Sequence, residues 1–159
     1  MLKQQTKLRV RLYARLSKDD GDADKESNSI TNQLQMLRYN ANEKGFEVIG
    51  EYVDDGYSGT TFNRPDLNRM IKDAMDDPEP SGIMVKDMSR FGRNNAMFMY
   101  YVEEIFPNND ILFIALNDDV DTRFDENEMM PFKSIMNEYY ARDTSKKIRS
   151  VKKTTALSG

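Results

Sequence analysis

The sequence predicts an α/β fold in which helices flank a mostly parallel central sheet and a long C-terminal helix follows. Short apolar segments with strand-like patterns alternate along the chain with segments whose apolar residues recur every three or four positions. Such alternation is typical of βα units, whose strands pair in parallel between layers of helices. With 159 residues and 38 % hydrophobic side chains, the chain is long enough for one domain with a substantial core.

Each expected element has a local signal. Residues 8–13 alternate apolar and polar side chains, which indicates a first strand with one buried face. A helix is expected from Ile30, after a cap at Ser27 or Ser29, and it ends at Gly45. The later strands are predicted at 46–53, 82–86 and 111–116, and the later helices at 66–77, 96–106 and from about 126 onward.

Serine and arginine residues follow three of the predicted strands, at the point where each strand ends. They are Arg15 and Ser17 after the first strand, Arg64 after the second, and Arg90 and Arg93 after the third. Because the carboxyl ends of parallel strands meet at one edge of a sheet, we expect these side chains to lie close together. Guanidinium groups stay charged, bind phosphate oxygens in pairs, and would stabilise the alkoxide of a serine among them. The pattern therefore favours a dianionic or phosphodiester partner, and it is compatible with a serine nucleophile that is activated without a histidine base.

Composition excludes several other chemistries. The chain has no cysteine and no histidine, which rules out disulfides, thiolate zinc sites, cysteine nucleophiles and Ser-His-Asp triads. Carboxylates near strand ends leave a metal-dependent nuclease as an alternative, but the arginines would repel the cations, and acidic turn residues are the preferred interpretation. These carboxylates are Asp54, Asp55, Asp118, Asp119 and Asp121.

The charge is distributed unevenly along the chain. The net charge is −4, yet residues 1–17 contain five basic and no acidic side chains, and residues 142–153 contain six basic side chains against Asp143 alone. Two basic ends suit a polyanion and equally suit solvated termini, so charge alone leaves both interpretations open. No apolar run approaches the roughly 20 residues of a membrane span and the N-terminus lacks a signal-peptide pattern, which predicts a cytoplasmic protein without membrane contact.

Four motifs occur in order along the chain: Tyr13-Ala14-Arg15-Leu16-Ser17; Ser29-Ile30 with Gln33; Asp55-Gly56-Tyr57-Ser58-Gly59 leading to Arg64-Pro65; and Ser89-Arg90-Phe91-Gly92-Arg93-Asn94. Together they resemble the catalytic domain of the serine recombinases, the resolvase/invertase family. Their order and spacing are similar to those of the large serine recombinases, which include phage integrases and the transposases of conjugative elements. The segment 137–147 is similar to the transposon branch in particular, and the choice between phage and conjugative transposon stays open.

The resemblance implies site-specific DNA recombination, as in the integration or excision of a mobile element. Ser17 would attack the scissile phosphate, forming a phosphoserine bond to the 5′ end and releasing a 3′ hydroxyl. The phosphate would be bound by Arg15, Arg64, Arg90 and Arg93, and the pocket would be supported by Tyr13, Gln33, Ser89 and Arg142. The phosphoserine bond conserves the energy of the broken bond, so the resemblance implies neither ATP nor metal nor another cofactor.

The resemblance also implies partners and a domain boundary. Dimers of the family bind DNA, pair into a tetramer, cut all four strands, rotate one half against the other and rejoin, so DNA and further copies of this chain are the expected partners. Residues 1–141 would form the catalytic domain, and residues 142–159 would begin the long dimerisation helix, cut short before the family's DNA-binding domains. The apolar stripe between Met129 and Tyr139 fits either core packing or a subunit interface. A bacterial or phage gene is expected.

The chain departs from the pattern of the smaller family members at several places, of which Ser89 bears most directly on the chemistry. Resolvases and invertases have an aspartate where this chain has Ser89, which puts any acid–base role for that position in doubt, although Asp87 lies two residues earlier. Two other functions stay open: a catalytically silent module that multimerises through the terminal helix and, less favoured, a metal-dependent nuclease or phosphatase.

Overall fold

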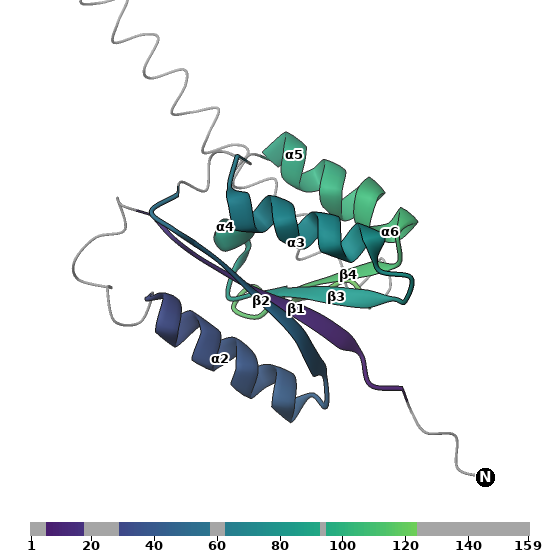
Figure 1. Cartoon of the computed structure of the whole chain (residues 1–159), viewed down its shortest axis with the longest axis horizontal. Coiled ribbons are helices and arrows are strands. Elements are labelled where there is room, and N and C mark those ends of the chain that lie inside the picture. Colours follow the sequence, from purple (N-terminus) through teal and green to yellow (C-terminus); the bar gives the residue numbers. More distant parts are fainter. Residues whose placement is uncertain (1–5, 18–28, 58–62, 93–94, 124–159) are drawn as a thin grey trace, which may run out of the picture.

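The computed structural model describes residues 6–17, 29–57, 63–92 and 95–123, in which a sheet lies between two layers of helices (Figure 1). The described sheet has five strands in the order β2-β1-β3-β4-β5. They are β1 (Arg9–Leu16), β2 (Glu47–Asp55), β3 (Ser81–Val85), β4 (Ile111–Ala115) and β5 (Val120–Asp121). Neighbouring strands pair in parallel except β4 and β5, which are antiparallel. The predicted α/β fold with a mostly parallel sheet is confirmed.

Helix α2 (Ile30–Glu43) covers one face of the sheet, and the other described helices cover the opposite face (Figure 1). The N–H of Asn32 donates to the Ser29 side chain, so the cap predicted at Ser29 is confirmed. The opposite layer comprises α3 (Pro65–Asp76), α4 (Met88–Phe91), α5 (Asn95–Tyr100), η2 (Tyr101–Ile105) and α6 (Phe106–Asn108).

The single helix predicted over 96–106 is in fact three consecutive helical segments. The middle segment, η2, is a π-helical turn, and α6 carries Pro107 in its first turn. Proline has no N–H to continue the regular hydrogen-bond ladder, which is consistent with a wider turn directly before it. Periodicity alone does not reveal this change, because the apolar spacing continues across it.

Alternation along β1 determines which layer each side chain faces. Val10, Leu12 and Ala14 belong to the buried cluster beneath α2, whereas Tyr13 belongs to the cluster on the opposite face. By the same period of two, Arg15 shares the face of Tyr13. β1 is an interior strand with a partner on each side, and helices cover this face of the sheet (Figure 1). The polar side chains Arg11 and Arg15 on this face are therefore buried.

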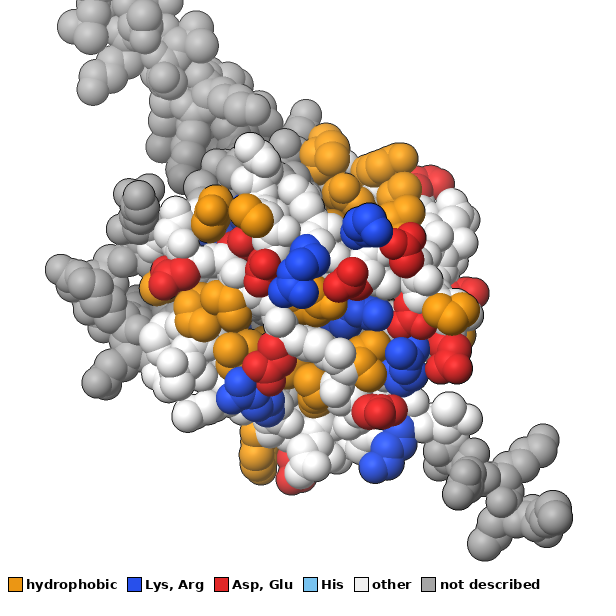
Figure 2. Space-filling model, viewed as in Figure 1, with side chains coloured by type: hydrophobic (Ala, Val, Ile, Leu, Met, Phe, Trp, Pro, Cys, Tyr) orange, Lys and Arg blue, Asp and Glu red, His pale blue; other side chains and the backbone are white. Residues whose placement is uncertain are grey.

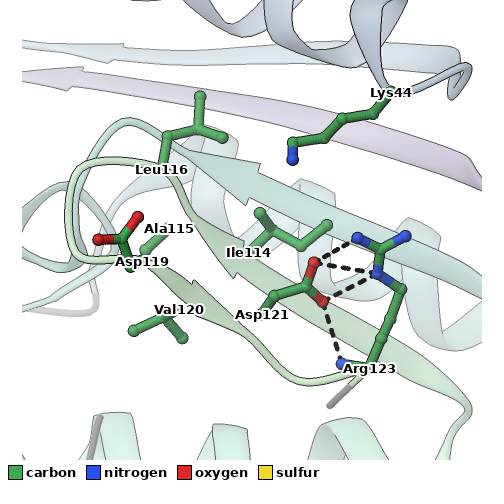
Figure 3. A pocket seen from close by; sticks show the side chains of 8 residues that line it. All are labelled: Lys44, Ile114, Ala115, Leu116, Asp119, Val120, Asp121 and Arg123. Carbon is green, nitrogen blue, oxygen red and sulfur yellow. Dashed lines mark hydrogen bonds and ion pairs between the residues drawn. The ribbon is translucent and has the colours of Figure 1, made fainter. Parts of the chain in front are cut away.

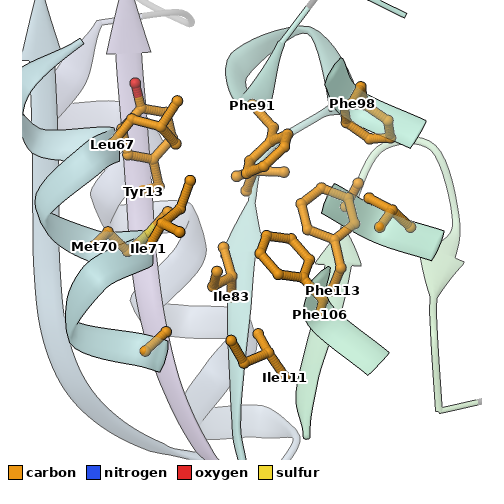
Figure 4. Packing of buried hydrophobic residues seen from close by; sticks show 14 of the residues in the cluster. Tyr13, Leu67, Met70, Ile71, Ile83, Phe91, Phe98, Phe106, Ile111 and Phe113 are labelled. Carbon is orange, nitrogen blue, oxygen red and sulfur yellow. The ribbon is translucent and has the colours of Figure 1, made fainter. Parts of the chain in front are cut away.

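Aromatic rings anchor α4 to the rest of the fold (Figure 4). The ring centroid of Phe91 lies 5.2 Å from that of Phe98, 5.7 Å from that of Phe106 and 5.1 Å from that of Phe113. All three contacts are edge-to-face, the arrangement that aromatic quadrupoles favour. Because Phe91 directly follows Arg90, this packing fixes the backbone that carries one of the predicted arginines.

A charged cluster lies at the opposite edge of the sheet, where the parallel strands begin. Nη1 of Arg9 donates to both carboxylate oxygens of Asp77, at 3.0 and 2.9 Å, and Nη2 of Arg11 donates to Oδ2 at 2.9 Å. The Asp77 side chain is 5 % exposed. Hydrogen bonding from Arg9 is the main reason that the pKa of Asp77 is lowered to about 2.

Asp77 is expected to make the protein sensitive to acid. Its folded pKa of about 2 lies below the ordinary 3.8, so its stabilising effect is complete above the ordinary value and is lost as the pH falls through about 2. We expect Asp77→Asn to lower the free energy of unfolding at neutral pH by about 2 kcal/mol, because two arginines lose their shared carboxylate. Urea unfolding of both proteins should show this difference at pH 7 and a smaller one at acidic pH. An equal difference at both pH values would contradict the assignment.

The surface face drawn in Figure 2 mixes charges of both signs. Apolar side chains gather on this face over α5, where Met97 and Tyr100 are exposed. Among the described helices, none is long and apolar enough to cross a membrane. The predicted helix from about 126, its apolar stripe, and the segment 142–159 lie outside the described residues.

Candidate active site

Three loops meet at the carboxyl edge of the sheet, and arginines connect them. Nε of Arg15, at the end of β1, donates to the carbonyl oxygen of Arg90 at 3.3 Å. Nη1 of Arg64, directly before α3, donates to the same oxygen at 2.8 Å. In return, Nη1 of Arg90 donates to the carbonyl oxygen of Arg15 at 3.0 Å. The expectation that these side chains lie close together is therefore met for three of the four arginines.

Arg15 is fully buried and holds two further loop segments. Its Nη1 donates to the carbonyl oxygen of Tyr57 at 3.0 Å, and its Nη2 donates to that of Ser89 at 2.9 Å. Gln33, on α2, pairs with the backbone of Arg15: its Nε2 donates to the Arg15 carbonyl at 3.0 Å, and its Oε1 accepts from the Arg15 N–H at 3.2 Å. Arg15 and Gln33 together fix the end of β1 from both faces of the sheet.

Arg64 is also fully buried, and it connects to a carboxylate through a tyrosine. Its Nη1 donates to the Tyr13 hydroxyl at 3.0 Å, its Nη2 donates to the carbonyl of Phe91, and the Tyr13 hydroxyl donates to Oδ2 of Asp54 at 2.8 Å. Burial lowers the pKa of Arg64 and raises that of Tyr13. The interior thus holds a cation that is costly to bury, with Tyr13 and Asp54 offsetting part of that cost.

Asp54 also organises the start of the neighbouring helix. Its Oδ1 accepts from the N–H of Asp66 at 3.0 Å, and its Oδ2 accepts from the N–H of Leu67 at 2.9 Å. These are N–H groups of the first turn of α3, which have no partner within the helix. The same carboxylate therefore caps α3 and supports the Tyr13–Arg64 pair.

Ser17 directly follows β1 and is partly exposed, at the edge of the sheet where the three loops meet. Arg90 and Ser89 lie on α4, a short helix in a segment that was predicted to be loop. Arg93 and Arg142 lie outside the described residues. Within the described part, the site therefore combines a partly exposed hydroxyl with a dense group of buried guanidinium cations.

Three of the five carboxylates weighed as metal ligands have other partners. Both oxygens of Asp54 accept hydrogen bonds, as described above. Oδ2 of Asp118 accepts from the N–H of Met88 at 2.7 Å, and burial raises the pKa of Asp118. Asp121 pairs with Arg123 through hydrogen bonds of 2.5 to 3.0 Å. Among the described residues, no three His, Cys, Asp or Glu side chains are close enough together to hold a metal ion.

A separate pocket of about 260 Å³ lies beside β4 and β5 (Figure 3). Leu116, Asp119 and the Asp121–Arg123 pair line it, and the Lys44 side chain extends toward it from the end of α2. None of the predicted site residues that the structure describes contributes to its lining. The pocket is therefore distinct from the arginine-rich site.

Asp54 and Asp118 are the supporting residues whose roles the sequence did not reveal. The sequence suggests only turn residues at these positions. Their contacts cross long stretches of sequence, since 12 residues separate Asp54 from Asp66 and 30 separate Met88 from Asp118. No local motif distinguishes such a carboxylate from a solvated one.

Fold and site together define an α/β domain in which a serine and three arginines lie at the carboxyl edge of a mostly parallel sheet. The sequence matches the family model "Resolvase, N terminal domain" over residues 10–159. The chain therefore belongs to the resolvase family, and the resemblance to serine recombinase catalytic domains is confirmed. A search of curated protein sequences finds no match.

Solved structures give the same assignment. The N-terminal catalytic domain of TP901-1 integrase is 28 % identical, with a TM-score of 0.68, and the match covers 84 % of this chain and 97 % of that one. A resolvase family site-specific recombinase from Streptococcus pneumoniae is 26 % identical, with a TM-score of 0.65 and coverage of 95 % and 97 %. The C-terminal catalytic domain of ISC1926 TnpA, an IS607-like serine recombinase, shares the fold at 20 % identity, with a TM-score of 0.57 and coverage of 94 % and 99 %.

Proposed function

We propose that this chain catalyses site-specific DNA recombination with Ser17 as the nucleophile. One observation carries the proposal: at the edge of the sheet where Ser17 lies, Arg15 and Arg64 both donate to the carbonyl oxygen of Arg90, and Arg90 donates to that of Arg15. Guanidinium cations gathered at the sheet edge where a serine follows β1 suit a phosphodiester, and membership of the resolvase family supports the same substrate class.

The proposed reaction is a transesterification. The Oγ of Ser17 attacks the scissile phosphorus, a bond forms between Oγ and phosphorus, and the bond from phosphorus to the 3′ oxygen breaks. The Ser17 hydroxyl gives up its proton, and the departing 3′ oxygen takes up a proton. The DNA then has a 5′ end esterified to Ser17 and a free 3′ hydroxyl. Rejoining reverses each of these steps on a new 3′ hydroxyl, so no nucleotide cofactor is consumed.

The arginines have two tasks in this proposal. They stabilise the negative charge that develops on the phosphate oxygens in the transition state. Arg15 and Arg64 also hold the loops by donating to carbonyl oxygens, contacts that a phosphate replaces when it enters, because an anionic phosphate oxygen attracts a guanidinium more strongly than a neutral carbonyl oxygen does. Arg93 completes the set of phosphate ligands, and Arg142 supports the pocket.

The proposal includes partners and location. The proposed partners are DNA and further copies of the chain. The copies would form dimers, and a tetramer during strand exchange. Residues 1–141 are the proposed catalytic domain, and residues 142–159 begin the proposed dimerisation helix. The reaction would take place in the cytoplasm of a bacterium that carries the mobile element.

A denaturing gel tests the proposal directly. The protein, expressed from its complete gene, is incubated in EDTA with supercoiled DNA that carries the ends of the mobile element, and the reaction is quenched in denaturant. We expect a covalent protein–DNA band that forms despite EDTA, with the 5′ phosphate mapped to Ser17 by mass spectrometry. Cleavage that needs a metal ion and leaves no covalent band would instead indicate a nuclease. DNA binding without cleavage would indicate a silent assembly module.

A further inference from the structure

We propose that Asp87 is a positioning residue of the active site, which orients the Arg90 guanidinium toward the phosphate and holds the Ser89 hydroxyl beside it. The inference rests on the proposed function, because it names a residue that tunes the same site. Asp87 itself is not proposed to touch the substrate.

The backbone position of Asp87 suggests a role that its side chain does not perform. Asp87 is the residue directly before α4. At this position the side chain of an aspartate usually accepts a hydrogen bond from a backbone N–H in the first turn of the helix. Its side chain makes no such capping hydrogen bond. The N–H of Arg90 donates to the backbone carbonyl of Asp87 at 3.2 Å, and Oδ2 of Asp118, in the turn between β4 and β5, accepts from the N–H of Met88 at 2.7 Å. The Asp87 carboxylate contacts other partners.

The partners of Asp87 are two side chains of the candidate site. The Ser89 hydroxyl donates to Oδ1 of Asp87. Oδ2 of Asp87 lies 3.7 Å from Nε of Arg90, and the side chains are 20 % and 6 % exposed respectively. An ion pair that is this well shielded from water is more effective than one on the open surface.

These contacts restrain the Arg90 guanidinium at two points. Its Nε side faces Asp87, and its Nη1 donates to the Arg15 carbonyl at 3.0 Å. The ion pair at Nε and the hydrogen bond at Nη1 limit the orientations open to the guanidinium, so Arg90 is largely oriented before DNA arrives. Such preorganisation accelerates a reaction because no reorientation is needed as charge develops in the transition state.

Single-turnover kinetics test the role of Asp87. With the protein from its complete gene and saturating DNA, we expect Asp87→Asn to slow covalent adduct formation about 10- to 100-fold while changing the Kd for DNA less than about threefold. Asp87→Glu should recover part of the rate, because a carboxylate can again reach Arg90. Asp119→Asn is the matched control: Asp119 is exposed in the neighbouring turn and has a φ of 52°, which asparagine adopts readily. Its rate should equal that of the wild type.

A double-mutant cycle separates the two contacts. If Asp87 acts through Ser89, the effects of Asp87→Asn and Ser89→Ala will not add, whereas additive effects assign its influence to Arg90. A wild-type rate for Asp87→Asn overturns the proposal. So does a slow rate that is accompanied by an equally large loss of folded protein and is not improved by Asp87→Glu, because the role is then merely structural.

A measurement without DNA keeps this inference separate from the proposed function. Titration of the ¹⁵N-labelled chain with inorganic phosphate should shift the Arg90 Nε–H signal, and Asp87→Asn should displace that signal and weaken phosphate binding severalfold, unlike Asp119→Asn. If the wild type forms no covalent adduct, the proposed function fails, and the phosphate titration then tests the positioning role of Asp87 by itself. An Arg90 signal that Asp87→Asn leaves unchanged overturns the inference.

Discussion

Replacing Ser17 by alanine is expected to eliminate covalent attachment of the protein to DNA, with the rate of adduct formation falling by at least about a thousandfold. The change removes the oxygen that would bond to phosphorus, and no histidine or cysteine exists in the chain to take its place. DNA affinity should change little, because the arginines that supply the positive charge are untouched. Denaturing gels measure the adduct, and a mobility-shift titration measures the affinity.

The matched control for Ser17→Ala is Thr31→Ala, which removes a hydroxyl from an exposed position on α2. Its adduct should form at the wild-type rate. An adduct that persists in Ser17→Ala would show that another side chain is the nucleophile. Loss of the adduct in both variants would point to a general defect instead. Thermal unfolding of both variants checks that each is folded.

The second large effect is expected at Asp54, where alanine should reduce the free energy of unfolding by about 3–5 kcal/mol. Asp54 is 2 % exposed, and its carboxylate accepts from the Tyr13 hydroxyl and from the N–H groups of Asp66 and Leu67. Alanine leaves these buried donors without an acceptor. It also removes a negative charge whose attraction favours the charged form of Arg64.

A graded series makes the Asp54 prediction specific. Asp54→Asn keeps one acceptor oxygen and should cost less than Asp54→Ala, and Tyr13→Phe removes one hydroxyl and should cost about 1–2 kcal/mol. Asp55→Ala, at the exposed neighbouring position, should change stability by less than about 0.5 kcal/mol. Urea unfolding monitored by circular dichroism measures the series. Equal losses at positions 54 and 55 would contradict the buried network.

Much of the sheet could be predicted from the sequence because its strands are short apolar runs. The runs expected at 82–86 and 111–116 correspond to β3 (Ser81–Val85) and β4 (Ile111–Ala115) within one residue at each end. The helix expected from Ile30 begins there. Two short elements, α4 and β5, were not predicted, since four and two residues are too few for any periodicity to appear.

The site was predictable in its location but not in its internal contacts. The rule that parallel strands end at one edge of the sheet is sufficient to predict that Arg15, Arg64 and Arg90 lie close together. It does not show that Arg15 and Arg64 are fully buried and donate to carbonyl oxygens, because that depends on how the loops close over the sheet. For the same reason, the role of Asp54 in the Tyr13–Arg64 network emerges only in three dimensions.

The place of β1 within the sheet has a mechanical consequence. β1 pairs with β2 over Arg9–Leu16 and with β3 over Val10–Tyr13, and Ser17 follows it directly. In the proposed covalent intermediate, tension on the DNA would be transmitted through Ser17 along β1 and shared by the hydrogen bonds on both of its sides. A strand at the edge of the sheet would instead have one ladder to resist the same force. The proposed nucleophile thus follows a strand that is held on both sides, which would resist the pull of an attached DNA end better than an edge strand.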